Sequence, residues 1–353
     1  MKKISIILAF MMLIPTFCSC QWKEEIDESL FSYESISPGE LDDSGTYYYG
    51  FTYIKYEDSH VVISGYKGAD PNAIVPAEIE GLPVTEIADR AFSDNTYITS
   101  ATIPSSITKI GEKAFSGCSS LVNVTVEGVG LTSIGDQAFY GTPYIVGNKT
   151  EFLTIGNGIL INYCGSNATV TVPEGVTVIA GAFENNAFLT EVILPSTLTT
   201  IGSYSFNGCS KLESINIPDS VTKIGQWAFA KCASLKSVII PDSVTSIGAK
   251  SFLLCEGLSS ITLSSKIVNI PDSAFQACRS LTEVTIPASV SVIDDNAFIR
   301  CTSLTKITIP DSVVRIGEMV FSECAEGLTV HCPEGSYAEE YCIGANIPTI
   351  SEQ

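Results

Sequence analysis

The sequence has few groups suited to acid–base or metal chemistry. Only two of its 353 residues are histidines, His60 and His331, and charged residues make up 16 % of the chain. Histidine is the side chain whose ordinary pKa lies closest to neutral pH, and it is also the commonest metal ligand. Its shortage counts against most hydrolytic and metal-centred mechanisms, so we expect no enzyme activity, no cofactor and no metal site.

Basic residues are also scarce. Nineteen Lys and Arg stand against 39 Asp and Glu, which gives a formal net charge of −20. Such a chain repels phosphate groups, which excludes nucleic acid and an anionic membrane surface as its main partners. The hydrophobic fraction is 45 %, enough to exclude a largely disordered protein.

The first twenty residues have the layout of a secretory signal peptide. Lys2 and Lys3 precede an apolar run over residues 4–17, which is broken only by Ser5, Pro15 and Thr16. A bilayer span needs about 20 apolar residues, and this run is shorter. Residues 1–20 are therefore predicted to be a targeting segment rather than part of the fold.

The end of this segment resembles a bacterial lipoprotein signal. Cys20 is the predicted lipidation site because it follows the small Ser19, whereas Cys18 follows Phe17. Phe17 also departs from the leucine that is usual three positions before the cysteine. A plain cleaved signal or an uncleaved anchor remains the alternative. The resemblance implies a lipid-anchored protein of the cell envelope, in the outer membrane with surface exposure and touching the membrane only through its lipid.

An acidic segment follows the signal. Residues 21–25 look like the lysine-plus-two-acids export tag of Bacteroides-type surface lipoproteins, although an ordinary acidic spacer is the alternative. Residues 21–45 carry eight acids against one base, Lys23. Like charges extend a chain, so we expect residues 21–45 to form a tether between the membrane and the folded domain.

A repeat of 23 residues organises the rest of the chain. Ten phenylalanines recur at regular intervals, and the last seven are spaced by 23 residues without exception. Each unit has seven apolar positions, too few for a core of its own, so the units must stack to bury a continuous column. The ten residues are Phe92, Phe115, Phe139, Phe183, Phe206, Phe229, Phe252, Phe275, Phe298 and Phe321.

Within a unit the pattern predicts a β-coil. Val238 and Ile240 share one face of a short strand while Ile239 points outward, and Pro241 ends the strand. Gly248 is expected to permit the bend that follows the second extended run. With about 4.8 Å between strands, ten coils make a rod of roughly 50 Å. Parallel crossovers are right-handed, so the coil should be right-handed too.

The repeat resembles a known family. The pattern CxSLxxIxIPxSVTxIGxxAF, present from Cys232 to Phe252, is similar to the BspA-type (Treponema-type) leucine-rich repeat. The similarity extends over about residues 60–330, with local departures at Ser264, Pro271 and Asp294. It implies a β-rich, right-handed leucine-rich-repeat solenoid of about ten 23-residue coils. It also implies a non-enzymatic surface protein for protein–protein binding or adhesion, whose partner is a protein or glycan ligand.

The pattern also sets the expected domain boundaries. Residues 46–80 should form an N-terminal cap built on a β-hairpin, because apolar residues alternate on both sides of a turn at residues 57–59. The solenoid should cover residues 81–330, with an insertion at about 140–165 where the period breaks. Residues 331–353 should form a C-terminal cap with a short helix, N-capped by Ser336.

Seven of the twelve cysteines form a second column, three residues after a repeat phenylalanine. Side chains stacked about 4.8 Å apart along a line fit neither a tetrahedral zinc site nor a ladder of disulfides. We therefore expect each thiol to be a small buried residue that fills a tight corner. In the C-terminal cap, Cys332 and Cys342 are candidates for a disulfide in an oxidising envelope, and Cys164 is expected to be unpaired.

Two surfaces are candidates for ligand binding. One is the outward face of the main sheet, a weakly charged stripe of mostly small polar residues without aromatic anchors. The other is the set of aromatic residues in the N-terminal hairpin and the insertion. The favoured interpretation is that these residues cover the ends of the coils, and the alternative is that some of them stack on sugars, as in a carbohydrate-binding accessory lipoprotein. The stripe comprises Ser214, Asn216, Ser237, Ile239, Ser260, Thr262, Thr285, Lys306 and Thr308. The aromatic set comprises Tyr47, Tyr48, Tyr49, Tyr53, Tyr56, Tyr66, Tyr140, Tyr144, Phe152 and Tyr163.

Overall fold

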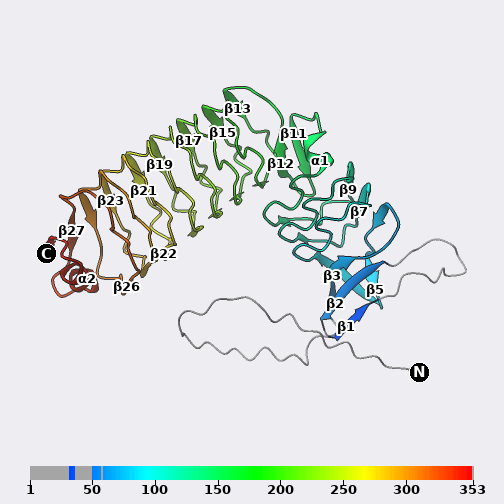
Figure 1. The fold of residues 1–353 in the computed structure, drawn as a ribbon, viewed down its shortest axis with the longest axis horizontal. Helices are drawn as coiled ribbons and strands as arrows, with labels where there is room; N and C mark the ends of the chain where they lie inside the picture. Colours follow the sequence, from blue (N-terminus) through cyan, green and yellow to red (C-terminus); the bar gives the residue numbers. More distant parts are fainter. Residues whose placement is uncertain (1–31, 36–49, 57–58, 352–353) are drawn as a thin grey trace, which may run out of the picture.

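The computed structural model describes residues 32–35, 50–56 and 59–351. The predictions for Cys20, the signal segment and most of the acidic tether lie outside these residues. The described chain winds into a β-solenoid that is bent into an arch, with the two caps at its ends (Figure 1). It makes about 13 turns of about 23 residues, more than the ten that the phenylalanines predict.

The first run of coils is built on two sheets, one on each side of the winding chain. The larger sheet begins with two antiparallel pairings and continues as a parallel ladder, and the smaller sheet is parallel throughout. The larger sheet contains β1 (Ser32–Ser35), β2 (Phe51–Tyr56), β3 (His60–Tyr66), β6 (Leu82–Ile87), β8 (Lys109–Ile110) and β10 (Ser133–Ile134), with β5 (Glu78–Ile79) beside β6, and the smaller one β4 (Asn72–Ile74), β7 (Ser100–Ile103) and β9 (Asn123–Val126).

The second run repeats this plan over a longer stretch. Its inner series is β11 (Phe152–Ile155), β12 (Ile159–Tyr163), β14 (Val178–Ile179), β16 (Thr200–Ile201), β18 (Lys223–Ile224), β20 (Ser246–Ile247), β22 (Asn269–Ile270), β24 (Val292–Ile293) and β26 (Arg315–Ile316). Its outer series is β13 (Thr169–Thr171), β15 (Glu191–Ile193), β17 (Ser214–Asn216), β19 (Ser237–Ile239), β21 (Ser260–Thr262), β23 (Glu283–Thr285), β25 (Lys306–Thr308), β27 (Thr329–Cys332) and β28 (Thr349–Ser351). In Figure 1 the labelled strands from β13 to β23 follow the outer edge of the arch.

Equivalent residues of successive coils lie directly over one another. Ser237 pairs with Ser214 on one side and with Ser260 on the other, a shift of one repeat in each direction. The phenylalanine rings stack in the same way, with centroids 5.2–5.5 Å apart from Phe183 to Phe298. The predicted apolar spine is therefore confirmed.

Tyrosines explain why the phenylalanines undercount the turns. Tyr66 stacks on Phe92 at 5.6 Å, and Tyr163 lies 5.0 Å from Phe183. At the C-terminal end, Tyr341 meets Phe321 edge-on at 6.2 Å. Each of these tyrosines adds one ring to the end of a phenylalanine stack, and so marks a turn that a count of phenylalanines misses.

The spine is divided into two cores. The first begins with a β-hairpin, and a second β-hairpin lies between them, with Leu153 and Ile159 in the first core and Leu160 and Tyr163 in the second. In the N-terminal hairpin, β2 pairs antiparallel with β3, which then pairs in parallel with β6. In the stretch where the sequence predicts an insertion, the short helix α1 (Pro143–Val146) is followed by β11 and β12, and β12 pairs in parallel with β14. Tyr144 of α1 covers the last ring of the first core, Phe139, at 5.6 Å. The second hairpin therefore starts a new run of coils.

The two hairpins end in the same local structure. A Cβ atom added to Gly68 would lie 2.4 Å from the ring of Tyr66, and one added to Gly165 would lie 2.3 Å from the hydroxyl of Tyr163. Both tyrosine rings thus lie against backbone that only glycine leaves room for. Each hairpin therefore ends in a tyrosine followed two positions later by a glycine, and both tyrosines pack on the first phenylalanine of a stack.

The C-terminal cap is the predicted short helix. Helix α2 (Tyr337–Ala345) begins at Ser336, whose hydroxyl accepts a hydrogen bond from the amide of Glu339 at 3.3 Å. It ends at Asn346, which adopts the left-handed conformation with φ 58°. Its inner residues Ala338 and Cys342 are buried against the last coil and cover the final edge of the core.

The role expected for Gly248 needs correction. Its φ is not in the left-handed region, so the bend does not require glycine for that reason. A Cβ atom at this position would instead lie 2.2 Å from the backbone nitrogen of Gln226 in the preceding coil. Glycine is needed there because two backbones approach each other too closely for any side chain.

Loss of a spine ring should be costly compared with loss of an outward side chain. Phe252 is fully buried between two stacked rings, so Phe252→Ala should lower the free energy of unfolding by roughly 3–5 kcal/mol through the cavity that it leaves. Ser237→Ala, on the exposed face, should change it by about 0.5 kcal/mol or less. Chemical denaturation of both variants measures the difference, and the opposite ranking would show that this register is wrong.

Candidate functional site

The outer strands present the polar stripe that the sequence predicts. In β17 and β19 the middle residue is buried while both its neighbours are exposed, and β23 follows the same pattern. Ile239 has 69 % of its surface exposed, whereas Thr308 near the C-terminal end is only partly exposed. Because the strands are stacked in register, the stripe is continuous along each parallel sheet of the second run.

Four of the six tyrosines of the aromatic set that the structure describes are buried. Tyr53, Tyr66, Tyr144 and Tyr163 each keep less than a tenth of their surface exposed, because they cover the ends of the two cores. Tyr140 differs, with 60 % of its surface exposed. Residues 47–49 lie outside the described part of the chain. The prediction that aromatic residues cover the coil ends is therefore confirmed for the four buried rings, and the alternative that they form a sugar-binding platform is wrong.

The cysteine column has a definite structural use. Each thiol donates a hydrogen bond to the carbonyl of the ring residue in the preceding coil, as from Cys255 to Phe229 at 3.0 Å and from Cys278 to Phe252 at 3.2 Å. Desolvation raises the pKa of Cys118 to about 11 and that of Cys209 to about 12. Such thiols are neutral donors at physiological pH rather than nucleophiles or metal ligands. The column comprises Cys118, Cys209, Cys232, Cys255, Cys278, Cys301 and Cys324.

The remaining candidates lie at the two ends of the molecule. Cys332 on β27 and Cys342 on α2 are buried in the same core, and burial followed by the charge of Cys332 raises the pKa of Cys342 to about 12. Their disulfide stays a prediction. His60 stacks on Tyr56 at 4.7 Å in the N-terminal hairpin, while His331 lies on β27 in the last coils. The two histidines are thus placed in opposite caps.

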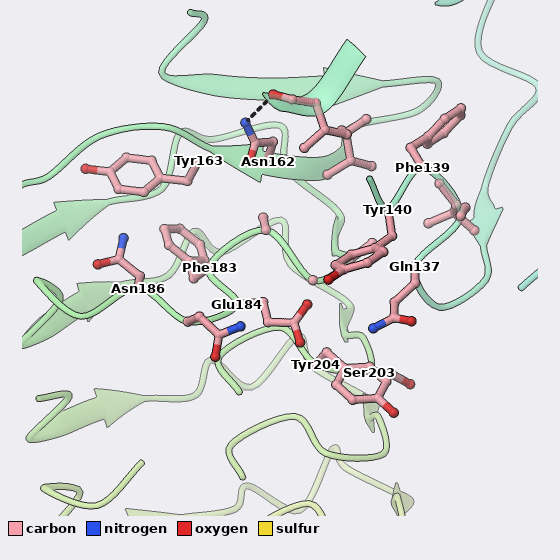
Figure 2. Close-up of a pocket in the computed structure, with 18 of the residues that line it drawn as sticks. Gln137, Phe139, Tyr140, Asn162, Tyr163, Phe183, Glu184, Asn186, Ser203 and Tyr204 are labelled. Carbon is pink, nitrogen blue, oxygen red and sulfur yellow. Dashed lines mark hydrogen bonds between the residues drawn. The ribbon is translucent and has the colours of Figure 1, made fainter. Parts of the chain in front are cut away.

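A pocket that the sequence pattern does not predict lies where the two runs of coils meet. Its volume is about 360 Å³, and residues 134–145 of the first run and residues 161–165, 180–188 and 203–204 of the second contribute to its walls. Figure 2 shows the side chains of Gln137, Tyr140, Glu184 and Tyr204 turned toward the same space. Small-molecule sites have this size and this mixture of rings with a few polar groups.

Both runs are joined beside the pocket. The side-chain amide of Gln226 donates a hydrogen bond to Asp136 at 2.6 Å, although the two residues are 90 positions apart. This contact joins the fourth coil of the second run to the last coil of the first.

Glu184 is the acidic group of the pocket. The side-chain amide of Asn207 donates to one of its oxygens at 3.1 Å. Desolvation raises the pKa of Glu184, while this hydrogen bond and the positive charge of Lys231 lower it. Among the described residues that line the pocket, none is basic. The pocket is therefore a partly desolvated acidic site walled by aromatic rings.

Sequence reasoning missed this pocket because its walls come from residues more than 60 positions apart. One local signal was present, since the period breaks between Phe139 and Phe183 and aromatic residues gather there. Among the described residues, no three His, Cys, Asp or Glu side chains are placed to hold a metal ion. No helix in the described part of the chain has the length and apolarity needed to cross a bilayer.

The cysteine column predicts a specific pattern of alkylation. With iodoacetamide at pH 8, Cys164, which is exposed, should be modified in the native protein, whereas the buried thiols should be protected until the protein unfolds. Mass spectrometry of peptides measures each site. The same map in denaturant without reductant tests the Cys332–Cys342 disulfide, because a bridged pair stays unmodified. Rapid native alkylation of Cys255 would contradict the buried column.

Comparison with known proteins agrees with this architecture. The chain matches the family described as "BspA type Leucine rich repeat region (6 copies)" over residues 85–213, 177–305 and 292–343, well over half of its length. Nothing among the curated proteins matches it.

Solved structures of bacterial leucine-rich repeat proteins are also similar. A leucine-rich cell surface protein from Faecalibacterium prausnitzii A2-165 is 29 % identical over 91 % of this chain and 100 % of its own, with a TM-score of 0.35. A leucine-rich repeat protein from Bacteroides ovatus ATCC 8483 is 24 % identical over 86 % and 98 %, with a TM-score of 0.29. The T. pallidum leucine-rich repeat protein is 21 % identical over 90 % and 94 %, with a TM-score of 0.30. TM-scores this low carry no argument about shape, but the family match is specific, and the chain belongs to the BspA-type leucine-rich repeat family.

Proposed function

We propose that this protein is a non-enzymatic scaffold of the cell surface that binds other proteins through the exposed stripe of its solenoid. The observation that carries the proposal is the continuous outer face of the second run, where exposed side chains flank a buried middle residue in strand after strand. A rigid, extended face of this kind provides a large contact area. Family membership supports the same role.

The composition of the stripe indicates how it would bind. Its side chains are mostly small and hydroxylated, and Ile239 is the large apolar residue among them. Such a face lacks the Tyr, Trp and Arg anchors that dominate strong interfaces. Affinity would then come from many weak contacts, multiplied by several copies displayed on one cell.

We propose that the protein is located on the outer surface of the cell and is anchored there by a lipid on Cys20. The lipoprotein-like signal and the acidic residues 21–45 support this proposal, because a charged tether would hold the solenoid away from the membrane. Adhesion to host matrix proteins or to other bacteria is the use that fits this placement.

Binding to proteins is tested with the purified protein on an array of extracellular matrix proteins and glycans. We expect saturable binding to at least one protein. Ser237→Arg combined with Ser260→Arg, which places two large cations on the stripe, should weaken that binding about tenfold or more. A matched control, Val268→Arg with Val314→Arg, changes two exposed residues outside the stripe and should leave binding unchanged. Absence of saturable binding to every protein presented would count against the proposal.

Lipidation is tested by metabolic labelling with an alkyne analogue of palmitate. The native protein should incorporate the label, and Cys20→Ala should lose it and leave the membrane fraction. Cys18→Ala is the matched control and should keep both label and location. Protease treatment of intact cells then reports surface display. A Cys20→Ala protein that stays labelled would refute the assignment.

A further inference from the structure

One side-chain position forms a second column, on the surface of the solenoid. The residue two positions before each repeat ring adopts the left-handed conformation, with φ 57° at Tyr204, 56° at Trp227 and 59° at Lys250. Its amide donates to the next coil, as from Tyr204 to the carbonyl of Gln226 at 3.1 Å. The side chains of this column therefore follow one another along the same edge.

Three consecutive side chains of this column, Tyr204, Trp227 and Lys250, lie over one another. The rings of Tyr204 and Trp227 are nearly parallel, at 6.1 Å and 8°. The ammonium group of Lys250 lies over the Trp227 ring, 5.5 Å from its centroid. The molecule thus contains a cation–π contact of its own at this position, within the distance of about 6 Å at which such contacts are effective.

The column is interrupted at its start by a glycine. Gly181 occupies the equivalent position one coil before Tyr204 and has the same left-handed backbone, with φ 72°. A Cβ atom added there would have the Ser203 carbonyl oxygen, 3.9 Å away, as its nearest neighbour. The space that a side chain would fill is open, and both Gly181 and Tyr204 line the junction pocket. Trp227 covers one face of Tyr204, and among the described residues no second aromatic ring or cation is stacked on the face toward Gly181.

The charges around this space favour a cation. Glu184 lies in the pocket wall, and the charges of Asp136, Glu184 and Glu112 raise the pKa of Tyr204 after the larger effect of desolvation, whereas Lys113 lowers it. Lys113 is itself paired with Glu112 at 2.7 Å, and Lys231 acts on Glu184 from outside the pocket. A bound cation would offset the cost of desolvating the Glu184 carboxylate and would meet the negative face of an aromatic ring.

We propose that the junction pocket binds an organic cation, an alkylammonium or guanidinium group, between the Glu184 carboxylate and the uncovered face of Tyr204. The cation occupies the place that Gly181 leaves open, on the face of Tyr204 that is opposite Trp227. The stacked pair of Tyr204 and Trp227 then has this cation at one end and the ammonium of Lys250 at the other. The alkyl part of the ligand lies against Phe139 and Phe188 in the pocket wall. This site is separate from the outer stripe and does not depend on the function proposed for it.

The ligand class is tested with small probes and the full protein. n-Butylammonium and butylguanidinium should bind saturably, with upfield ring-current shifts of their methylene protons in NMR titrations at constant ionic strength. n-Butanol, which has nearly the same shape without the charge, should bind at least tenfold more weakly. Nα-acetyl-lysine amide tests the source of the cation. If it binds, the site can admit a lysine side chain of a partner protein. If it does not bind, the site is restricted to small amines that are not part of a polypeptide.

The position is tested with three variants. Glu184→Gln removes the charge while keeping an acceptor for Asn207, and it should weaken n-butylammonium binding about tenfold. Gly181→Lys puts a long cationic side chain into the space that the ligand would occupy, at a backbone conformation that this column already accommodates, and it should abolish binding. Glu213→Gln removes an exposed carboxylate that pairs with Lys236 elsewhere on the solenoid, and it should change nothing.

Two results would overturn the proposal. Equal affinity for n-butanol and n-butylammonium would show that the pocket binds the alkyl chain and does not recognise the positive charge. Unchanged binding to Gly181→Lys, with thermal denaturation showing that this variant is folded, would place the cation elsewhere on the acidic surface. Neither result depends on whether the stripe binds a protein, so failure here and failure of the proposed function are distinguishable.

Discussion

The fold depends on one constraint, that equivalent side chains of successive coils lie at the spacing of neighbouring β-strands. At this spacing phenylalanine rings stack nearly parallel, 5.3 Å apart between Phe206 and Phe229, and each thiol reaches the carbonyl of the coil before it at 3.0–3.2 Å. The same spacing brings backbones so close at Gly248 that a side chain would collide with the preceding coil. Every coil contacts mainly its neighbours, so stability accumulates along the stack rather than around one centre.

The first and last rings of such a stack must be covered, and in this structure aromatic residues cover them. The N-terminal hairpin and β11–β12 each place a tyrosine, Tyr66 or Tyr163, on the first ring of a core. Tyr144 closes the first core and Tyr341 closes the second. The aromatic residues that might have bound sugars are used to cover core ends, which leaves the outer stripe as the extended surface and the junction as the concave one.

The junction between the two runs differs from the rest of the solenoid because the regular contacts between neighbouring coils are interrupted there. In the uninterrupted part of the second run, side chains such as Trp227 and Lys250 cover their neighbours, and carboxylates such as Glu213 are paired with a base one coil away. At the start of that run Gly181 leaves one face of Tyr204 uncovered, and Glu184 accepts a hydrogen bond from Asn207 but forms no salt bridge with any described residue. The individual features of this repeat protein therefore lie where a repeat is missing and a neighbouring coil no longer supplies the usual partner.

The sequence by itself determined the coil, the spine of rings and the buried thiols, because each follows from a local pattern repeated every 23 residues. The N-cap signal at Ser336 determined the helical cap in the same way, without the repeat. It also indicated where the period fails, between Phe139 and Phe183. Only the tertiary structure decided that this failure divides the core in two, that Tyr53 and Tyr163 are buried, and that Gln137 and Tyr204 share a pocket. The physical reason is that a periodic pattern fixes contacts one coil apart, whereas the bend between two runs depends on how their ends pack.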